Sequence, residues 1–238
     1  MAPLLVIKPG SKLASLAGVC GDFNDWILAA MGVAKADGVV VEVARGDVLP
    51  PPQTVAGAVI TGSAAMVSDR DAWREVAAAW LRAAVERDVP VLGICYGHQL
   101  LAHALGGEVD YNPAGVEVGT IELIVTAEAR EDALFGGLPA RFPAQASHRQ
   151  SVRRLPPGAR RLATSAMDAN HAFVCGQRAW GVQFHPEFDA MIVQHYVRHY
   201  APLLQAQGVD SDALAARCVA TPQAATVLSH FAQVVGFA

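Results

Sequence analysis

The first half of the chain alternates short apolar runs with stretches in which apolar residues recur at helical spacing. Four apolar runs are predicted to be strands, at residues 4–7, 39–43, 58–61 and 89–94. Helices are predicted to begin after Asp22 or Asn24, to run from Asp69 or Asp71 to about residue 87, and to span residues 97–105. Strands that alternate with helices form βαβ units, and right-handed crossovers place the helices on both faces of the sheet. The predicted fold class is therefore α/β, with a mostly parallel, doubly wound sheet.

After residue 109 the pattern changes to β-rich pieces that no linker separates from the first half. Strands are predicted over residues 116–126, 161–165, 172–175 and 180–184, and helices over residues 193–204 and 223–235. We interpret residues 1–187 as one domain with a small additional β elaboration. Residues 188–238 are predicted to be a helical C-terminal extension that packs on the same domain.

Composition narrows the possible partners and locations. The chain has 238 residues, of which 53% are hydrophobic and 17% charged, and its net charge is −4. Without an excess of positive charge we expect no nucleic-acid partner, and with three lysines no polybasic membrane patch. No apolar run approaches the roughly 18 residues of a membrane span, and the start lacks the pattern of a signal peptide. Four widely spaced cysteines argue against a cysteine-based zinc site or a disulfide scaffold. We therefore expect a cytoplasmic protein.

The first candidate catalytic residue is Cys95, in the run VLGICYGHQ at residues 91–99. An apolar strand leads into Cys95 and a helix begins two residues later, so the thiol is expected at the carboxyl end of the sheet, where doubly wound folds bind ligands. Gly93 and Gly97 leave room for a tight turn and a close substrate. The ordinary alternative is a small buried cysteine at a strand end.

The second candidate is the pair His185 and Glu187, in the run AWGVQFHPEF at residues 179–188. Alternate residues of an extended chain point the same way, so Glu187 can reach the imidazole, hold one tautomer and stabilise the charged ring. Taken alone, such a segment is more often a surface turn. Together with Cys95, it supplies a base and an orienting carboxylate for a nucleophile.

The two segments together resemble the class I glutamine amidotransferases, and most closely the amidotransferase domain of GMP synthase. The pattern GxCxGxQ at residues 93–99, followed by HPE at residues 185–187, carries the resemblance. It covers residues 4–187 and implies a flavodoxin-like sheet and a catalytic triad of Cys95, His185 and Glu187. The implied reaction is hydrolysis of the side-chain amide of L-glutamine through a γ-glutamyl thioester on the cysteine, which releases glutamate and ammonia.

Such a reaction forms a tetrahedral oxyanion that needs backbone donors. The N–H of Tyr96 follows the nucleophile, as in other nucleophile elbows. The resemblance places the second donor at Gly62, and it implies that Gln99 and the pair Ser147 and His148 hold the substrate.

Two segments depart from the resemblance. Arg149 and Gln150 stand where GMP synthases have Gly-Asp, and the run GSA at residues 62–64 stands where many relatives have Gly-Gly-Pro. These positions bear on the substrate and on coupling to a partner rather than on the acyl chemistry.

Three functions remain open on the sequence alone. The sequence has no GxxxxGK[ST] phosphate loop and no glycine-rich pyrophosphatase loop, so we do not expect a complete ATP-dependent synthetase. The chain is then an amidase component that passes ammonia to a separate synthase, or a free-standing hydrolase of γ-glutamyl peptides or γ-glutamyl amines. A non-catalytic binding module is the third possibility, and the intact triad argues against it. No cofactor or metal is expected, since His195 and His199 stand one helical turn apart without a third ligand.

Overall fold

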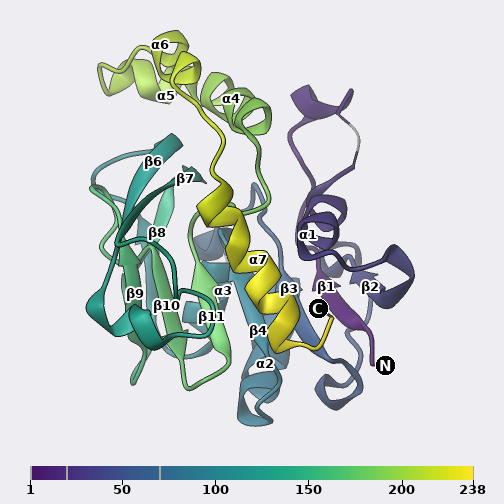
Figure 1. Ribbon diagram of the computed structural model, residues 1–238. Helices are drawn as coiled ribbons and strands as arrows, with labels where there is room; N and C mark the ends of the chain where they lie inside the picture. Colours follow the sequence, from purple (N-terminus) through teal and green to yellow (C-terminus); the bar gives the residue numbers. More distant parts are fainter. Residues whose placement is uncertain (1, 20, 70, 238) are drawn as a thin grey trace.

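The computed structural model describes residues 2–19, 21–69 and 71–237 (Figure 1). Within these residues, nine strands form one sheet in the order β2-β1-β3-β4-β11-β10-β9-β6-β7, and β5 pairs separately with β8. The strands are β1 (Leu4–Ile7), β2 (Gly38–Val41), β3 (Gly57–Ile60), β4 (Val91–Ile94), β5 (Glu108–Tyr111), β6 (Glu117–Val125), β7 (Arg141–His148), β8 (Gln150–Arg154), β9 (Arg160–Thr164), β10 (Ala172–Cys175) and β11 (Ala179–Val182). The helices are α1 (Phe23–Met31), α2 (Ala72–Glu86), α3 (Tyr96–Ala104), α4 (Ala190–His199), α5 (Ala201–Ala206), α6 (Ser211–Ala216) and α7 (Pro222–Val234).

One half of the sheet is parallel. β2, β1, β3, β4 and β11 run in the same direction, and their order is the 2-1-3-4-5 order of flavodoxin-like folds when β11 is counted as the fifth strand. The predicted α/β class with a doubly wound, mostly parallel sheet is confirmed. Between β4 and β11 the chain builds the antiparallel strands of the other half and then returns to complete the parallel one.

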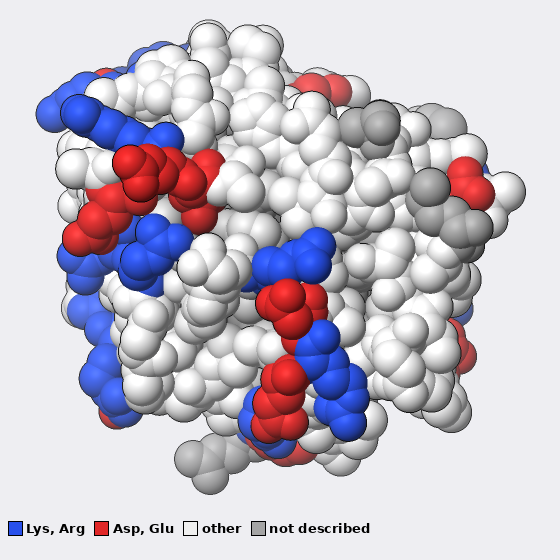
Figure 2. Space-filling model, turned by 60° about the horizontal axis from the view of Figure 1, so that its bottom comes forward, with Lys and Arg blue, Asp and Glu red and all other residues white. Residues whose placement is uncertain are grey.

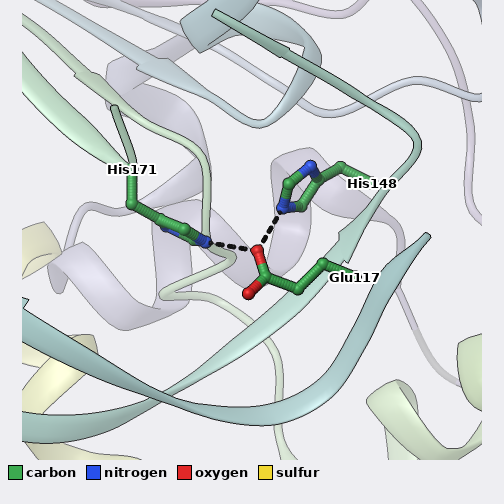
Figure 3. A group of neighbouring side chains, drawn as sticks. All are labelled: Glu117, His148 and His171. Carbon is green, nitrogen blue, oxygen red and sulfur yellow. Dashed lines mark hydrogen bonds and ion pairs between the residues drawn. The ribbon is translucent and has the colours of Figure 1, made fainter. Parts of the chain in front are cut away.

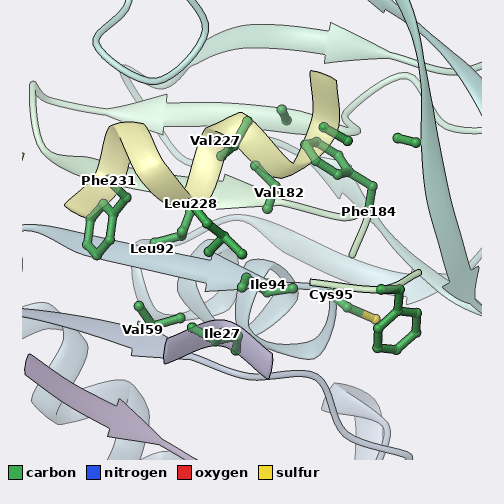
Figure 4. Close-up of a cluster of buried hydrophobic side chains, with 14 of the residues drawn as sticks. Ile27, Val59, Leu92, Ile94, Cys95, Val182, Phe184, Val227, Leu228 and Phe231 are labelled. Atoms are coloured by element: carbon green, nitrogen blue, oxygen red, sulfur yellow. The ribbon is translucent and has the colours of Figure 1, made fainter. Parts of the chain in front are cut away.

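Four of the five parallel strands, β1, β3, β4 and β11, are buried on both faces, whereas the edge strand β2 exposes Val39 and Val40. In β1, Leu4 and Val6 belong to the core that also contains side chains of α1 and α7, whereas Leu5 and Ile7 belong to the core under α2 and α3. Figure 4 shows the first core, where side chains of α7, among them Val227, point toward the strands. Burial on both sides explains why these strands are continuous apolar runs in the sequence rather than alternating ones.

The first helix begins where a side chain satisfies its free backbone amides. Asp22 accepts from the N–H of Phe23 at 2.8 Å, and the Asp22 N–H donates to the carboxylate of Asp25 at 3.0 Å, which forms a capping box. Of the two predicted caps, Asp22 rather than Asn24 therefore starts α1. Asp71 rather than Asp69 is the residue before α2.

The second half contains three strands that the sequence did not predict: β5, β7 and β8. β7 carries Pro143, and apart from Phe142 its buried positions are small or polar, among them Ala144, Gln145 and Ser147, so it lacks the apolar run of a buried strand. Its place in the sheet depends on pairing with β6. Two predicted strands are also shorter than expected: residues 39–43 end as β2 at Val41, where a 3-10 turn follows, and residues 180–184 end as β11 at Val182.

The helical segment predicted over residues 193–204 is two helices. α4 and α5 meet at Tyr200, and Pro202 stands in the first turn of α5, where it has no N–H to continue the hydrogen bonds of α4. α6 was not predicted. In Figure 1 these three helices gather at one end of the molecule, while α7 crosses the sheet. A core shared with the sheet contains Val227 and Phe231 of α7.

Candidate functional site

Three neighbouring parallel strands end at one edge of the sheet, and each leads to a residue singled out from the sequence. β3 leads to Gly62, β4 to Cys95 and β11 to His185, with β4 in the middle. Val182 at the end of β11 pairs with Ile94 at the end of β4, so the residues that follow both strands emerge side by side. This edge is the one at which α/β folds bind ligands.

Cys95 occupies a strained turn between β4 and α3. Its φ is 52°, and among the described residues other than glycine only Asp88 also has a positive φ. The turn requires close packing, because a Cβ on Gly93 would overlap the carbonyl of Gly97, and a Cβ on Gly97 would overlap the carbonyl oxygen of Ile60. The two glycines let α3 lie directly against β3 and β4. The thiol is thereby presented at the strand end, where Figure 4 shows it at the edge of the core.

His185 is held on several sides. Its Nδ1 lies 2.7 Å from Oε1 of Glu187, its backbone N–H donates to the carbonyl of Gln145 at 2.8 Å, and its ring stacks on Phe188 with centroids 3.9 Å apart. Since Nδ1 faces a carboxylate, that nitrogen carries a hydrogen, and Nε2 is left for the nucleophile. Burial opposes protonation of the ring, but the charges of Glu187 and Cys95 and hydrogen bonds to both outweigh it and raise the pKa of His185 to about 10. The site therefore favours an imidazolium beside the cysteine.

The two expected oxyanion donors adjoin these residues. Tyr96 is the first residue of α3, so its N–H has no acceptor one turn earlier in the helix. Gly62 is so close to His185 that a Cβ on it would come within 2.8 Å of the ring atom Cε1. A side chain at this position would push against the imidazole, so the glycine has a steric reason to be there.

Two small cavities meet at Cys95. One is lined by His185 and the other by Gln99, and both are also lined by Ser63, Ser147 and Tyr200. The Cys95 Sγ lies 3.5 Å from the carbonyl oxygen of Ser147. An acyl group on the thiol would thus have a leaving-group side toward His185 and a second side toward Gln99.

The predicted substrate residues lie on that second side, in different roles. The amide nitrogen of Gln99 donates to the carbonyl of Gln150 at 2.8 Å and to the side chain of Gln183 at 3.0 Å, which leaves only Oε1 for a substrate. Ser147, near the end of β7, lines the cavity wall. The ring of His148 is buried, and its Nε2 faces Glu117 (Figure 3).

The two residues that depart from the resemblance line the same cavity. The side chain of Gln150 accepts from the backbone N–H of Val67 at 3.0 Å and donates to Ser68 at 2.6 Å, so it fixes the loop that follows Gly62. The guanidinium of Arg149 lies over the ring of Tyr111 at 5.2 Å.

Sequence reasoning missed two contributors to this region. The first is α4, whose Tyr196 and His199 line the leaving-group side together with Tyr200 beyond its end. The histidine pair in this helix was treated as a solvated face, and the aromatic residues carried no motif. The second is Glu117, which lies within an ordinary predicted strand and belongs to no motif.

Glu117, His148 and His171 form the one group of three potential metal ligands found among the described residues, with ligand atoms within 4.8 Å of one another. The Oε2 of Glu117 lies 2.8 Å from Nε2 of His148 and 3.2 Å from Nε2 of His171. Zinc bonds of about 2.0–2.1 Å in tetrahedral geometry hold ligand atoms about 3.3 Å apart. The shorter carboxylate–imidazole distance fits a shared proton better than a shared metal ion.

Other surfaces offer less chemistry. A further cavity of about 470 Å³ lies between the loop at residues 46–49 and α2, and Asp47 is the one titratable residue that lines it. Acidic and basic side chains lie beside one another on the face drawn in Figure 2, rather than gathering in a field of one sign. Across the described ranges, no helix combines the length and hydropathy needed to cross a membrane.

The fold and the site define a flavodoxin-like α/β protein with a cysteine at a nucleophile elbow and a histidine–glutamate pair beside it. A family model described as glutamine amidotransferase class-I matches residues 23–197. The chain belongs to the class I glutamine amidotransferase family.

Named relatives agree with this assignment. The chain is 40% identical over 137 residues to a glutamine-hydrolyzing GMP synthase of Thermomicrobium roseum, and the match covers 55% of this chain and 23% of the relative. It is 42% identical over 103 residues to one subunit of the glutamine-hydrolyzing GMP synthase of Archaeoglobus fulgidus, covering 43% of this chain and 54% of that protein. The chain thus spans about a quarter of the first relative and about half of the second.

Two solved structures extend the similarity to the whole chain. A glutamine amidotransferase from Thermotoga maritima superposes with a TM-score of 0.76 at 20% identity, covering 99% of both chains. A glutamine amidotransferase from Methylobacillus flagellatus superposes with a TM-score of 0.72 at 26% identity, covering 100% of this chain and 94% of the other. The helices after residue 187 are included in these superpositions.

Proposed function

We propose that the protein hydrolyses the side-chain amide of L-glutamine through a γ-glutamyl thioester on Cys95. The observation that carries the proposal is the convergence of Cys95 with the His185–Glu187 pair at the ends of adjacent strands β4 and β11. Amides are poor acyl donors, and a thioester divides the difficult step into two easier ones.

In the first step the Cys95 thiolate attacks the amide carbon. The negative charge that develops on oxygen is stabilised by the backbone N–H groups of Gly62 and Tyr96. The C–N bond then breaks as His185 donates its Nε2 proton to the departing nitrogen, which leaves as ammonia. Glu187 holds the Nδ1–H of the ring throughout and stabilises the imidazolium.

In the second step a water molecule attacks the thioester carbon. The now neutral His185 accepts a proton from the water, the C–S bond breaks, and glutamate leaves. The thiolate and the imidazolium are restored together. We place the leaving group in the cavity lined by His185, and the α-amino and α-carboxylate end of the substrate in the cavity lined by Gln99, Ser147 and His148.

The names of the relatives support a partner. The Archaeoglobus fulgidus relative is named as one subunit of a GMP synthase, so we propose that the ammonia passes to an acceptor on a separate synthase. A free-standing γ-glutamyl peptide or γ-glutamyl amine hydrolase would use the same triad with a larger leaving group. We also propose that residues 188–238 extend the same domain, since α7 shares a core with the sheet.

The test is a rate comparison with the isolated protein. We expect slow release of glutamate and ammonia from L-glutamine, faster with a cognate synthase, and a protein mass increase equal to glutamine minus ammonia. Cys95→Ala should abolish both. Cys175→Ala is the matched control, because burial raises the pKa of that thiol to about 12 and keeps it inert.

Two outcomes would redirect the proposal. A γ-glutamyl peptide that is cleaved about a hundredfold faster than glutamine corresponds to a specificity difference of about 2.7 kcal/mol, and it would favour the free-standing hydrolase. Absence of both turnover and adduct, with a candidate synthase present, would favour a non-catalytic binding module.

A further inference from the structure

A buried carboxylate and two histidines lie behind the proposed substrate site. Glu117 of β6 and His148 of β7 are cross-strand partners in the sheet register, and His171 approaches from the residue before β10. One carboxylate oxygen of Glu117 lies 2.8 and 3.2 Å from Nε2 of the two rings (Figure 3). The other oxygen accepts a hydrogen bond from the hydroxyl of Ser165 at 2.7 Å. The three titratable side chains are at most 3% exposed.

Hydrogen counting limits the protonation states that this cluster can adopt. Nδ1 of His148 lies 2.9 Å from the carbonyl oxygen of Gln150, which can only accept. Its Nε2 lies against Glu117, which already accepts from Ser165 and is paired with His171. Nδ1 of His148 therefore carries a hydrogen, and Nε2 shares a second proton with Glu117, which belongs to the ring when the carboxyl is ionised.

The electrostatics of the cluster agree with this count. Burial opposes ionisation of Glu117, but hydrogen bonds from His148 and His171 outweigh it and lower the pKa of the carboxyl. Burial likewise opposes charging of His148, but the hydrogen bond and charge of Glu117 outweigh it and raise the pKa of the ring, with smaller contributions from Asp168 and Cys95.

The remaining titratable neighbour does not compete for this proton. Burial lowers the pKa of His98, which interacts electrostatically with His171 and His148, to about 3, so that ring is neutral. A buried ion pair left without one partner is strongly destabilising, which ties the charge of His148 to that of Glu117.

The charged ring is connected directly to the reaction site. The carbonyl of Gln150 that accepts from His148 also accepts from the side chain of Gln99. One residue before His148, the carbonyl of Ser147 lies 3.5 Å from the Cys95 Sγ. The ring therefore connects both ends of the turn that forms one wall of the cavity, and its positive charge interacts with Cys95.

We propose that Glu117 and His171 are positioning residues that keep His148 as an imidazolium at neutral pH, so that His148 fixes the turn at residues 147–150 and stabilises the Cys95 thiolate. This rests on the proposed function in one respect, the assignment of Cys95 as the nucleophile. The Cys95 thiolate would then interact with two imidazolium rings, His148 and His185, and only His185 exchanges protons with the substrate.

The direct test measures the protonation of His148 in the unaltered protein, and a variant of the cluster serves only to assign its signals. Nitrogen NMR of the histidine side chains, with His148 identified by the signals absent from His148→Gln, reports how many ring nitrogens carry hydrogen. We expect two on His148 from pH 6 to pH 8. A single protonated nitrogen there would overturn the proposal, as would a stoichiometric divalent metal, measured by elemental analysis, bound to the purified protein.

The functional test is the pH dependence of Cys95 alkylation by iodoacetamide, with the other cysteines replaced. Glu117→Gln keeps hydrogen-bonding atoms in place but removes the charge, so the midpoint of the alkylation profile should move to higher pH. Alkylation at pH 6 should fall about tenfold for each unit by which the midpoint rises. Glu122→Gln is the matched control, because Glu122 lies on the same strand and pairs with Arg141 of β7 at the surface.

The possible outcomes distinguish a failure of the proposed role of this cluster from a failure of the proposed function. A merely structural role would lower the alkylation rate equally at all pH values, and an unchanged midpoint in Glu117→Gln would overturn the proposal. Alkylation needs no glutamine turnover, so a shifted midpoint in a protein that does not hydrolyse glutamine would support the cluster and contradict the proposed function.

Discussion

Two buried histidine–glutamate pairs flank the same cysteine, and they differ in what faces the second nitrogen of each ring. His185 pairs with Glu187 at 2.7 Å and His148 pairs with Glu117 at 2.8 Å, and in both cases the pKa of the ring is raised. Nε2 of His185 is left for the thiol, whereas Nδ1 of His148 is committed to a backbone carbonyl. A ring with one free nitrogen can move a proton, and a ring with both nitrogens committed can only hold one.

The pairs also differ in how the chain builds them. Glu187 stands two residues after His185 within a single turn, so the pair is local. Glu117 stands 31 residues before His148 and meets it through the pairing of β6 with β7. Equivalent chemistry is thus assembled once by a short motif and once by sheet register, and substitutions should affect the two pairs in separable ways.

The largest effect is expected from replacing Cys95, the residue that both pairs flank. Cys95→Ala should abolish turnover while the protein remains folded, because alanine removes one buried atom and the elbow is fixed by glycine packing. A glutamine-based electrophile should label Cys95 and spare Cys175 and Cys218, as well as Cys20, which lies outside the described residues. Peptide mapping by mass spectrometry measures this, and even labelling of all the cysteines would contradict the assignment.

The next effect separates the base from its carboxylate. His185→Ala should lower kcat by about 10³-fold or more, since it removes both proton transfers, and Glu187→Ala by about 10–100-fold, since an unoriented imidazole still acts. Steady-state kinetics of glutaminase activity gives both values. Near-normal rates in His185→Ala would refute the triad, and complete inactivity of a folded Glu187→Ala would show that the carboxylate does more than orient.

A smaller effect should come from crowding the catalytic ring alone. In Gly62→Ala, the new Cβ would stand 2.8 Å from Cε1 of His185 and displace the imidazole. We expect kcat to fall by about tenfold or more, in line with small misplacements of catalytic groups, while the NMR signals of His148 stay unchanged. Gly18→Ala is the matched control, because a Cβ there meets nothing within 4 Å. Equal kinetics for the two variants would contradict the close approach of the His185 ring to Gly62.

The smallest expected effect is on stability. Because the pKa of Glu117 is lowered in the folded protein, its carboxylate stabilises the fold at pH values above the ordinary pKa of 4.5, and this stabilisation is lost as the pH falls. Because the pKa of His148 is raised, its imidazolium stabilises the fold at pH values below the ordinary pKa of 6.5, and this stabilisation is lost as the pH rises. The free energy of unfolding lost in Glu117→Gln, about 1–3 kcal/mol, should therefore be largest between pH 4.5 and 6.5. Urea unfolding at pH 3, 5.5 and 9 measures it, and a loss independent of pH would indicate that the pair is uncharged.

Much of the fold and of the proposed triad follows from local pattern. Four of the five parallel strands are short apolar runs because both of their faces are buried, and the elbow at Cys95 is marked by Gly93 and Gly97, which no other residue could replace without overlap. The HPE motif brings its carboxylate to its own imidazole. Each of these features depends on interactions within a few residues, or on burial that a sequence records directly as hydrophobicity.

Register, by contrast, is decided by the folded sheet. β7 has no apolar run to reveal it, and its pairing with β6 is what brings Glu117 to His148 and Ser147 to Cys95. The lining of the cavity by Tyr196 of α4 and the hydrogen bond from Val67 to the side chain of Gln150 likewise join segments far apart in the chain. The sequence by itself determined the parallel strands, the elbow and the local histidine–glutamate pair. Only the tertiary structure decided the second pair and the cavity walls, because side chains distant along the chain meet only when the whole sheet has formed.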